Sequence, residues 1–184
     1  SSDRNLMHVS HEGGVLEDPW CEPPEEMYQL TRDPAAASST ATDVCVRFEH
    51  GVPVSVDGVE QAMVDIVAQL NDLAGAYGIG RLDVVENRVI GLKSRGVYET
   101  PGVTVLALAW RTLQTLCFDR PTLAWIDSLG DQLACQAYDG RWHAPECRLV
   151  RRAIADACGA VGGEVRIRLA AGHASLLGRR SDGS

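Results

Sequence analysis

The spacing between apolar residues changes along this chain from two to about 3.6 and back, and these changes constrain its fold more than any other feature. Val44, Val46 and Phe48 alternate with polar residues, as in a strand with one buried face. The alternation resumes over residues 52–56 after a turn at Gly51, which predicts a β-hairpin. Pro53 places the second strand at an edge or a bulge, because proline lacks the N–H that a strand ladder uses.

Helical spacing follows over residues 59–76 and predicts the first helix. Three more helices are predicted over residues 100–118, 119–139 and 145–160, because Pro101, Pro121 and Pro145 each suit a first helical turn. Thr100 and Asp119 stand at capping positions ahead of two of them.

Two short strands are predicted at residues 82–86 and 89–92, with a polar loop over residues 93–99. A closing hairpin is predicted over residues 165–177, with its turn at Gly172. This order of elements predicts an α+β fold in which antiparallel β-hairpins or a sheet pack with about four helices. Residues 1–43, rich in Pro, Gly, Ser and acidic residues, are expected to be an irregular segment. Residues 44–178 form the main domain, and residues 179–184 a polar tail.

Composition narrows the class of protein. Seventeen basic against 25 acidic residues give a net charge of −8, which argues against a nucleic-acid partner. Lys93 is the only lysine among the basic residues. No apolar run approaches the ~18 residues of a membrane span, and the polar first residues lack the apolar core of a secretory signal. We therefore expect a cytoplasmic protein whose six scattered cysteines stay reduced, and no metal site is predicted because finger-like Cys and His spacing is missing.

Four polar segments are candidate functional sites. Ser10 and Glu12 precede two glycines, so they either hold a polar ligand or form an ordinary turn. Glu86 ends an apolar strand, either as a site residue or in a salt bridge with Arg88. The segment Lys93 to Glu99 gathers cations, a hydroxyl and the phenol of Tyr98, either near an anion or as a solvated connector.

The fourth segment holds His143, which is more typical of a surface or capping group than of a base. No phosphate-binding loop, dinucleotide fingerprint or nucleophile elbow is present, and no catalytic residue is predicted. The residues alone therefore indicate a ligand-binding or interaction domain.

The run GRLDVVENRVIGLKSRGVYETPG at residues 80–102 resembles the signature of the argininosuccinate synthase family. The runs NLMHVSHEGGVLEDP (5–19), PEEMY (24–28) and GRWHAPEC (140–147) are similar to family segments too, in family order, as is the hairpin around Gly51. The resemblance covers nearly the whole chain but matches only the family's C-terminal half. It implies that residues 44–178 are the synthetase or multimerisation domain and that residues 1–43 carry part of a citrulline site.

The resemblance also implies an activity: ATP-dependent ligation of citrulline and aspartate to argininosuccinate, with release of AMP and pyrophosphate, in arginine biosynthesis. ATP with Mg²⁺, and aspartate, would bind mainly to a nucleotide domain that this chain does not contain, and the complete enzyme would be a homo-oligomer. The family's citrulline-binding positions match Ser1, Ser10, Glu12, Glu86 and Tyr98.

Lys93 and Arg95 either neutralise charge near the nucleotide or serve as structural partners. His11 departs from the family, because an aromatic residue is usual there. The alternative function is a non-catalytic, truncated paralogue that binds an amino acid or assembles with a complete synthase.

Overall fold

The strands with alternating apolar and polar residues form the larger of two antiparallel sheets, in the order β5-β4-β3-β8-β9. The computed structural model describes residues 1–183. The strands of this sheet are β3 (Thr42–Glu49), β4 (Val52–Val56), β5 (Val59–Glu60), β8 (Gly163–Ala170) and β9 (His173–Ser181). Val46 of β3 and Val165 of β8 are directly paired and fully buried, whereas Asp43 and Arg168 form an ion pair on the other face. One face therefore carries the core and the other meets solvent.

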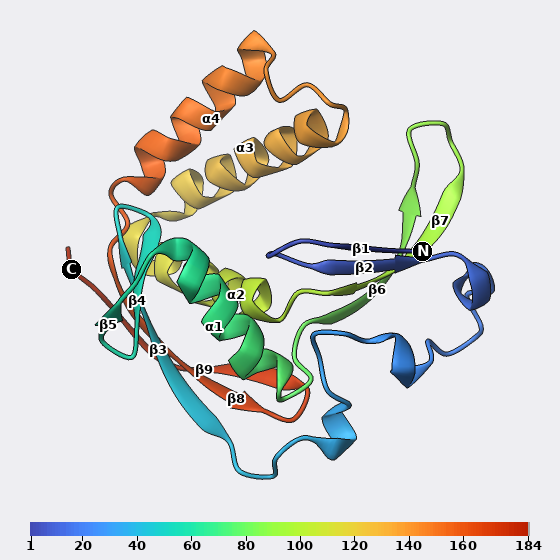
Figure 1. The fold of residues 1–184 in the computed structure, drawn as a ribbon. Helices are drawn as coiled ribbons and strands as arrows, with labels where there is room; N and C mark the ends of the chain where they lie inside the picture. The colour runs from blue at the N-terminus through green and yellow to red at the C-terminus, as the bar shows by residue number, and fades with distance from the viewer. Residues whose placement is uncertain (184) are drawn as a thin grey trace.

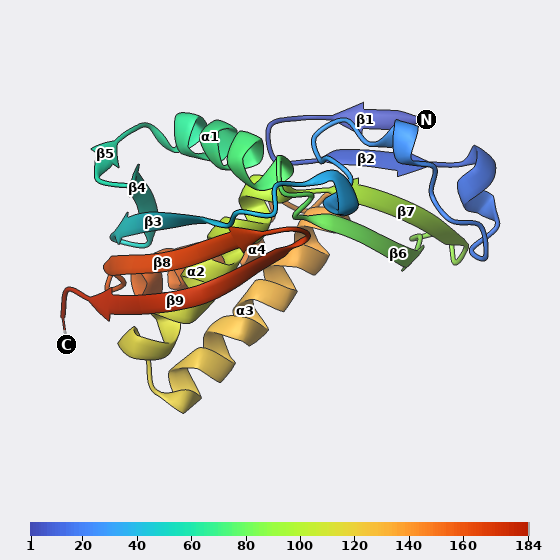
Figure 2. The ribbon, with the colours of Figure 1, turned by 90° about the horizontal axis from the view of Figure 1, so that it is seen from below.

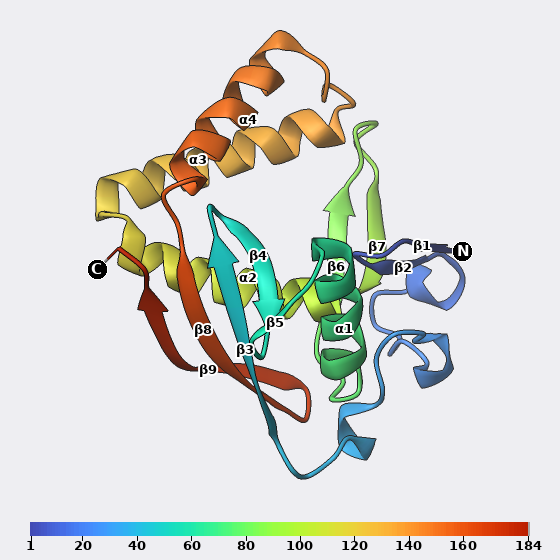
Figure 3. The ribbon, with the colours of Figure 1, turned by 60° about the vertical axis from the view of Figure 1, so that its left-hand side comes forward.

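Four α-helices lie within the described residues: α1 (Met63–Gly75), α2 (Pro101–Cys117), α3 (Arg120–Tyr138) and α4 (Pro145–Cys158). Figure 3 shows α2 behind the strands of the larger sheet and α1 beside them. Leu70 of α1 and Leu113 of α2 are fully buried in the core they share with this sheet. Helices α3 and α4 form a hairpin that extends away from it (Figure 1). The predicted α+β class and the number of helices are confirmed.

The smaller sheet has the strand order β1-β2-β7-β6 and lies beside the larger one (Figure 2). Its strands are β1 (Ser2–Arg4), β2 (Val9–Glu12), β6 (Arg81–Asn87) and β7 (Lys93–Glu99). The irregular segment expected at residues 1–43 is therefore wrong in part: it contains two strands and the 3-10 turns Gly14–Glu17, Glu25–Met27 and Pro34–Ala36. Strands this short show no apolar alternation of their own; β2 gains its regularity from pairing with β7, and β1 from pairing with β2.

The strand expected at residues 89–92 is also wrong. Arg88 N–H donates to Leu92 C=O at 2.7 Å, and Gly91 N–H donates to Arg88 C=O at 2.8 Å, so this stretch is the β6–β7 turn. Val89 and Ile90 are apolar yet 74% and 78% exposed, so the apolar residues that suggested a buried strand are on the surface of a turn. The segment expected to be a loop, residues 93–99, is β7 itself.

Smaller expectations have mixed outcomes. The register of β3 against β4 shifts between Arg47 and Phe48, opposite Pro53, so the predicted bulge is confirmed. Strand β9 continues to Ser181, into the expected polar tail. No helix in residues 1–183 is both long enough and apolar enough to cross a bilayer.

Candidate functional site

Strand register places the predicted ligand residues on one face of the smaller sheet. Ser10 of β2 lies directly opposite Tyr98 of β7, and Glu12 lies opposite Gly96. On the other side of β7, Glu86 of β6 lies opposite Ser94. Because paired residues share a face and side chains alternate along each strand, Ser10, Glu12, Tyr98 and Glu86 all lie on the same face.

Ser1 joins this face at its edge. Its backbone nitrogen donates to the backbone oxygen of Glu12 at 2.7 Å, and its carbonyl accepts the Glu12 N–H at 3.0 Å. The structure thus brings together, on one sheet face, all five residues that the resemblance implicated.

Four charged and polar side chains form a connected cluster on this face: Glu12, Glu86, Arg88 and Tyr98. Arg88 Nη2 lies 2.7 Å from Glu12 Oε1, and Arg88 Nη1 lies 3.8 Å from Glu86 Oε2. The Tyr98 hydroxyl donates to Glu86 Oε1. The two carboxylates and the guanidinium remain about one-third exposed, so a ligand in solution can reach them.

Gly96 explains how Tyr98 reaches Glu86, which is not its direct partner. A Cβ at position 96 would lie 2.8 Å from Tyr98 Cε2 and 3.1 Å from its hydroxyl oxygen, so the ring lies along β7 over the glycine. This close approach needs the absent side chain.

The cluster has a defined charge. Burial, followed by the hydrogen bond to Glu86 and the neighbouring carboxylate charges, raises the pKa of Tyr98 to about 12. The hydrogen bond to Glu12 raises the pKa of Arg88. At neutral pH the phenol is therefore an uncharged donor and acceptor beside a permanent cation.

Arg88 is a site residue that the sequence did not reveal. From the sequence it was only a candidate salt-bridge partner for Glu86, yet its shorter contact is with Glu12. Its Nη2 also donates to the hydroxyl of Ser94 at 3.2 Å. The tight β6–β7 turn places it there, and sequence spacing carries no sign of a contact with β2.

Lys93 and Arg95 occupy alternate positions of β7, so they lie on the opposite face from Tyr98. Arg95 pairs with Asp83 at 2.6 Å and donates to the carbonyls of Asp18 and Cys21 at 2.9 Å. Lys93 Nζ donates to Asn87 Oδ1 at 2.8 Å. These contacts favour the structural reading of both residues.

Residues from both faces of the smaller sheet line a common depression at one edge of this sheet. An open depression of about 500 Å³ lies where β2 stops and β7 continues, and it is lined by Ser1, Glu12, Lys93, Ser94 and Arg95, among others. Polar ligand groups held by Glu12 could extend into it.

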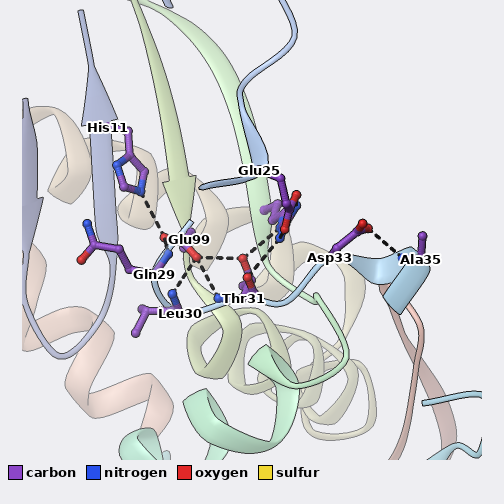
Figure 4. A network of polar contacts seen from close by, with 9 residues as sticks. His11, Glu25, Gln29, Leu30, Thr31, Asp33, Ala35 and Glu99 are labelled. Atoms are coloured by element: carbon purple, nitrogen blue, oxygen red, sulfur yellow. Dashed lines mark hydrogen bonds and ion pairs between the residues drawn. The ribbon is translucent and has the colours of Figure 1, made fainter. Parts of the chain in front are cut away.

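A buried network of hydrogen bonds on the opposite face joins β2 and β7, the two central strands of the smaller sheet (Figure 4). Glu99, next to Tyr98 on β7, is fully buried and contacts His11 Nε2 of β2 at 3.1 Å. It also accepts three backbone N–H bonds from residues 29–31, each of 2.8 Å, and the Thr31 hydroxyl at 2.7 Å. Burial raises the pKa of Glu99, but the hydrogen bonds from Gln29, His11, Thr31 and Leu30 together outweigh it and lower that pKa.

The remaining candidate segment is separate from this face. His143 is exposed in the connection between α3 and α4, and its neighbour Arg141 pairs with Glu146. Within residues 1–183, no group of three His, Cys, Asp or Glu side chains is arranged to hold a metal ion.

Comparisons with known proteins identify the family of this chain. The family described as the arginosuccinate synthase C-terminal domain matches residues 1–184. The argininosuccinate synthase of Syntrophus aciditrophicus is 48% identical over 98% of this chain, and that of Desulfatibacillum aliphaticivorans is 46% identical over 100% of it. The chain spans 45% and 46% of those two relatives' lengths. It therefore belongs to the argininosuccinate synthase family and corresponds to the C-terminal domain of its members.

Proposed function

We propose that this chain is the C-terminal part of an enzyme that ligates citrulline to aspartate, and that the Ser10–Tyr98 face of its smaller sheet binds the citrulline. The register that gathers Ser10, Glu12, Glu86 and Tyr98 on one face is the observation that carries the proposal. Family membership supports the reaction.

The cluster suits an amino acid ligand. Carboxylates are strong acceptors for an ammonium group, so Glu86 and Glu12 would hold the α-ammonium or a ureido nitrogen through charge-assisted hydrogen bonds. The Tyr98 hydroxyl and the hydroxyls of Ser10 and Ser1 would accept from, or donate to, the remaining polar groups of the ligand.

In the proposed reaction the ureido oxygen of citrulline attacks the α-phosphorus of ATP, and pyrophosphate leaves. The amine of aspartate then attacks the ureido carbon and displaces AMP. The role of this chain is to bind and orient the citrulline. ATP with Mg²⁺, and aspartate, would be held mainly by a nucleotide domain. We further propose that the complete enzyme is a cytoplasmic homotetramer in arginine biosynthesis.

The test joins this chain to the preceding portion of the Syntrophus aciditrophicus relative and measures pyrophosphate release. Release that requires both citrulline and aspartate is expected, and Glu86→Gln should raise the KM for citrulline while leaving that for ATP unchanged. Exposed Glu49→Gln, on the other sheet, is the matched control. No release, while the intact relative is active, would overturn the proposal and favour a non-catalytic module, which a pull-down with a complete synthase would then detect.

A further inference from the structure

We propose that Arg88 sets the charge of the citrulline-binding face and thereby selects an amino acid with a neutral side chain over one with a cationic side chain. This role, which rests on the proposed function of the face, is one of specificity rather than catalysis. It starts from one observation: a single guanidinium contacts both carboxylates that would receive the ligand.

The position of Arg88 is fixed by its backbone. The residue directly follows β6, and its N–H and C=O are both bonded across the β6–β7 turn, to Leu92 and Gly91. From this position its guanidinium reaches Glu12, Glu86 and Ser94.

The net charge of the cluster follows from these contacts. Glu12 and Glu86 contribute two negative charges and Arg88 one positive charge, while Tyr98 is neutral because burial and Glu86 raise its pKa to about 12. Within the described part of the chain, Arg88 is the one cationic side chain in ion-pair contact with either carboxylate. The cluster thus carries one net negative charge, half of what its two carboxylates would carry without Arg88.

A second ligand cation would find no unshared carboxylate and would face the guanidinium of Arg88. Citrulline and ornithine differ in this respect, because citrulline carries a neutral ureido group where ornithine carries an ammonium group. Without Arg88 the cluster would hold two net negative charges, and its attraction for the additional ammonium group of ornithine would increase relative to the neutral ureido group of citrulline. The groups are about one-third exposed, so solvent screening limits the expected change in relative affinity to about tenfold.

A purely structural role for Arg88 predicts something different. Ion pairs that remain this exposed contribute little to the stability of the fold, about 0–1 kcal/mol. Arg88→Gln should therefore fold normally, and a structural role would leave the relative affinity for the two ligands unchanged.

The experiment measures Kd by NMR titration of this chain at low ionic strength, followed through the amides of Ser94 and Tyr98. The ligands are citrulline and ornithine, together with butylamine and 1,4-diaminobutane as a simple cation and dication. Four proteins are compared: the unchanged chain, Arg88→Gln, Arg88→Lys and Arg111→Gln. Arg111 pairs with Asp127 between α2 and α3, so its replacement removes the same charge at another place.

In Arg88→Gln we expect the preference for citrulline over ornithine to fall about tenfold, and the diamine to gain similarly over the monoamine. Arg88→Lys should restore most of the preference, and Arg111→Gln should not change it. The inference would be overturned if the citrulline-to-ornithine and monoamine-to-diamine affinity ratios were unchanged in Arg88→Gln. It would also be overturned if all four ligands gained affinity equally, because Arg88 would then only compete with them for the carboxylates. If the unchanged chain binds citrulline no better than butylamine, the amine pair still tests Arg88, and the pyrophosphate assay of the joined protein decides the proposed function separately.

Discussion

Replacing Glu99 by glutamine should weaken the buried hydrogen bonds that join β7 to His11 of β2 and to residues 29–31. The carboxylate of Glu99 has no exposed surface, and five donors converge on its two oxygens. Three of these donors reach Oε1 and two reach Oε2. Glutamine offers a single acceptor oxygen, so one set of donors must face an NH₂ group.

The magnitude follows from that count. With the amide oxygen in the Oε1 position, the NH₂ group faces the Gln29 N–H, a donor against a donor at 2.8 Å, and the charge that attracts His11 is lost. Hydrogen bonds to a charged group contribute about 1.5–3 kcal/mol each. Since a neutral amide is also cheaper to bury than a carboxylate, we expect a net loss of about 3 kcal/mol in the free energy of unfolding.

Urea denaturation checks this value. With an m-value of about 2 kcal/mol/M, the midpoint should fall by about 1.5 M. Glu49→Gln, which alters a half-exposed ion pair with Arg47, should cost less than about 1 kcal/mol. Amide hydrogen exchange at residues 29–31 should accelerate in the Glu99 variant alone, because these N–H groups lose their acceptor.

The pH dependence has a definite sign. The pKa of Glu99 is lowered in the folded protein, so its contribution is complete above the unfolded pKa of about 4.3 and is lost as the pH falls through the folded value. The difference between the two proteins should thus be largest near neutral pH and shrink below about pH 4. A loss of less than about 1 kcal/mol at neutral pH would refute the reasoning, because the carboxylate would then not be the main anchor.

Three further predictions concern the site and the core. Tyr98→Phe should remove the tyrosine that titrates at about pH 12 in ultraviolet absorbance, and the unchanged protein should lose stability as the pH rises above about 10, because the unfolded chain ionises first. Gly96→Ala should push the Tyr98 ring off the strand and lower its pKa toward 10, which the same titration would detect; an unmoved value would contradict the close contact. Leu113→Ala, at a fully buried position, should cost about 2–5 kcal/mol in urea denaturation, whereas Leu149→Ala, 63% exposed, should cost less than about 1 kcal/mol.

The predicted bounds of the helices are most accurate where a proline marks the start of a helix. The three helices that carry an early proline begin within one residue of the expected starts, with Asp119 accepting the Thr122 N–H as their one confirmed side-chain cap. Thr100 was expected to cap α2 in the same way, yet its hydroxyl bonds to Gly80 C=O and Thr104 instead. A proline favours a helix start through its own backbone geometry, whereas a side-chain cap can be lost to another acceptor, here the carbonyl of Gly80 just before β6.

The candidate site was predictable as a list but not as an arrangement. The family signature pointed to Ser10, Glu12, Glu86 and Tyr98, and their one shared face follows from the pairing of β2 and β6 with β7. Arg95 was expected from the sequence to have a separate role, either near the nucleotide or structural, and strand alternation turns it to the opposite face.

The sequence by itself determined the α+β class, the four helices and the two hairpins that the larger sheet contains, because apolar periodicity and helix-starting prolines act over a few neighbouring residues. Only the tertiary structure decided the smaller sheet and its site. Strands β1 and β2 are too short to bear a pattern. The register of β2 is set by β7, a strand far away in the sequence, and β1 pairs with β2. A shift of one residue in that register would turn Ser10 and Glu12 away from Tyr98, because side chains alternate between the two faces of a sheet.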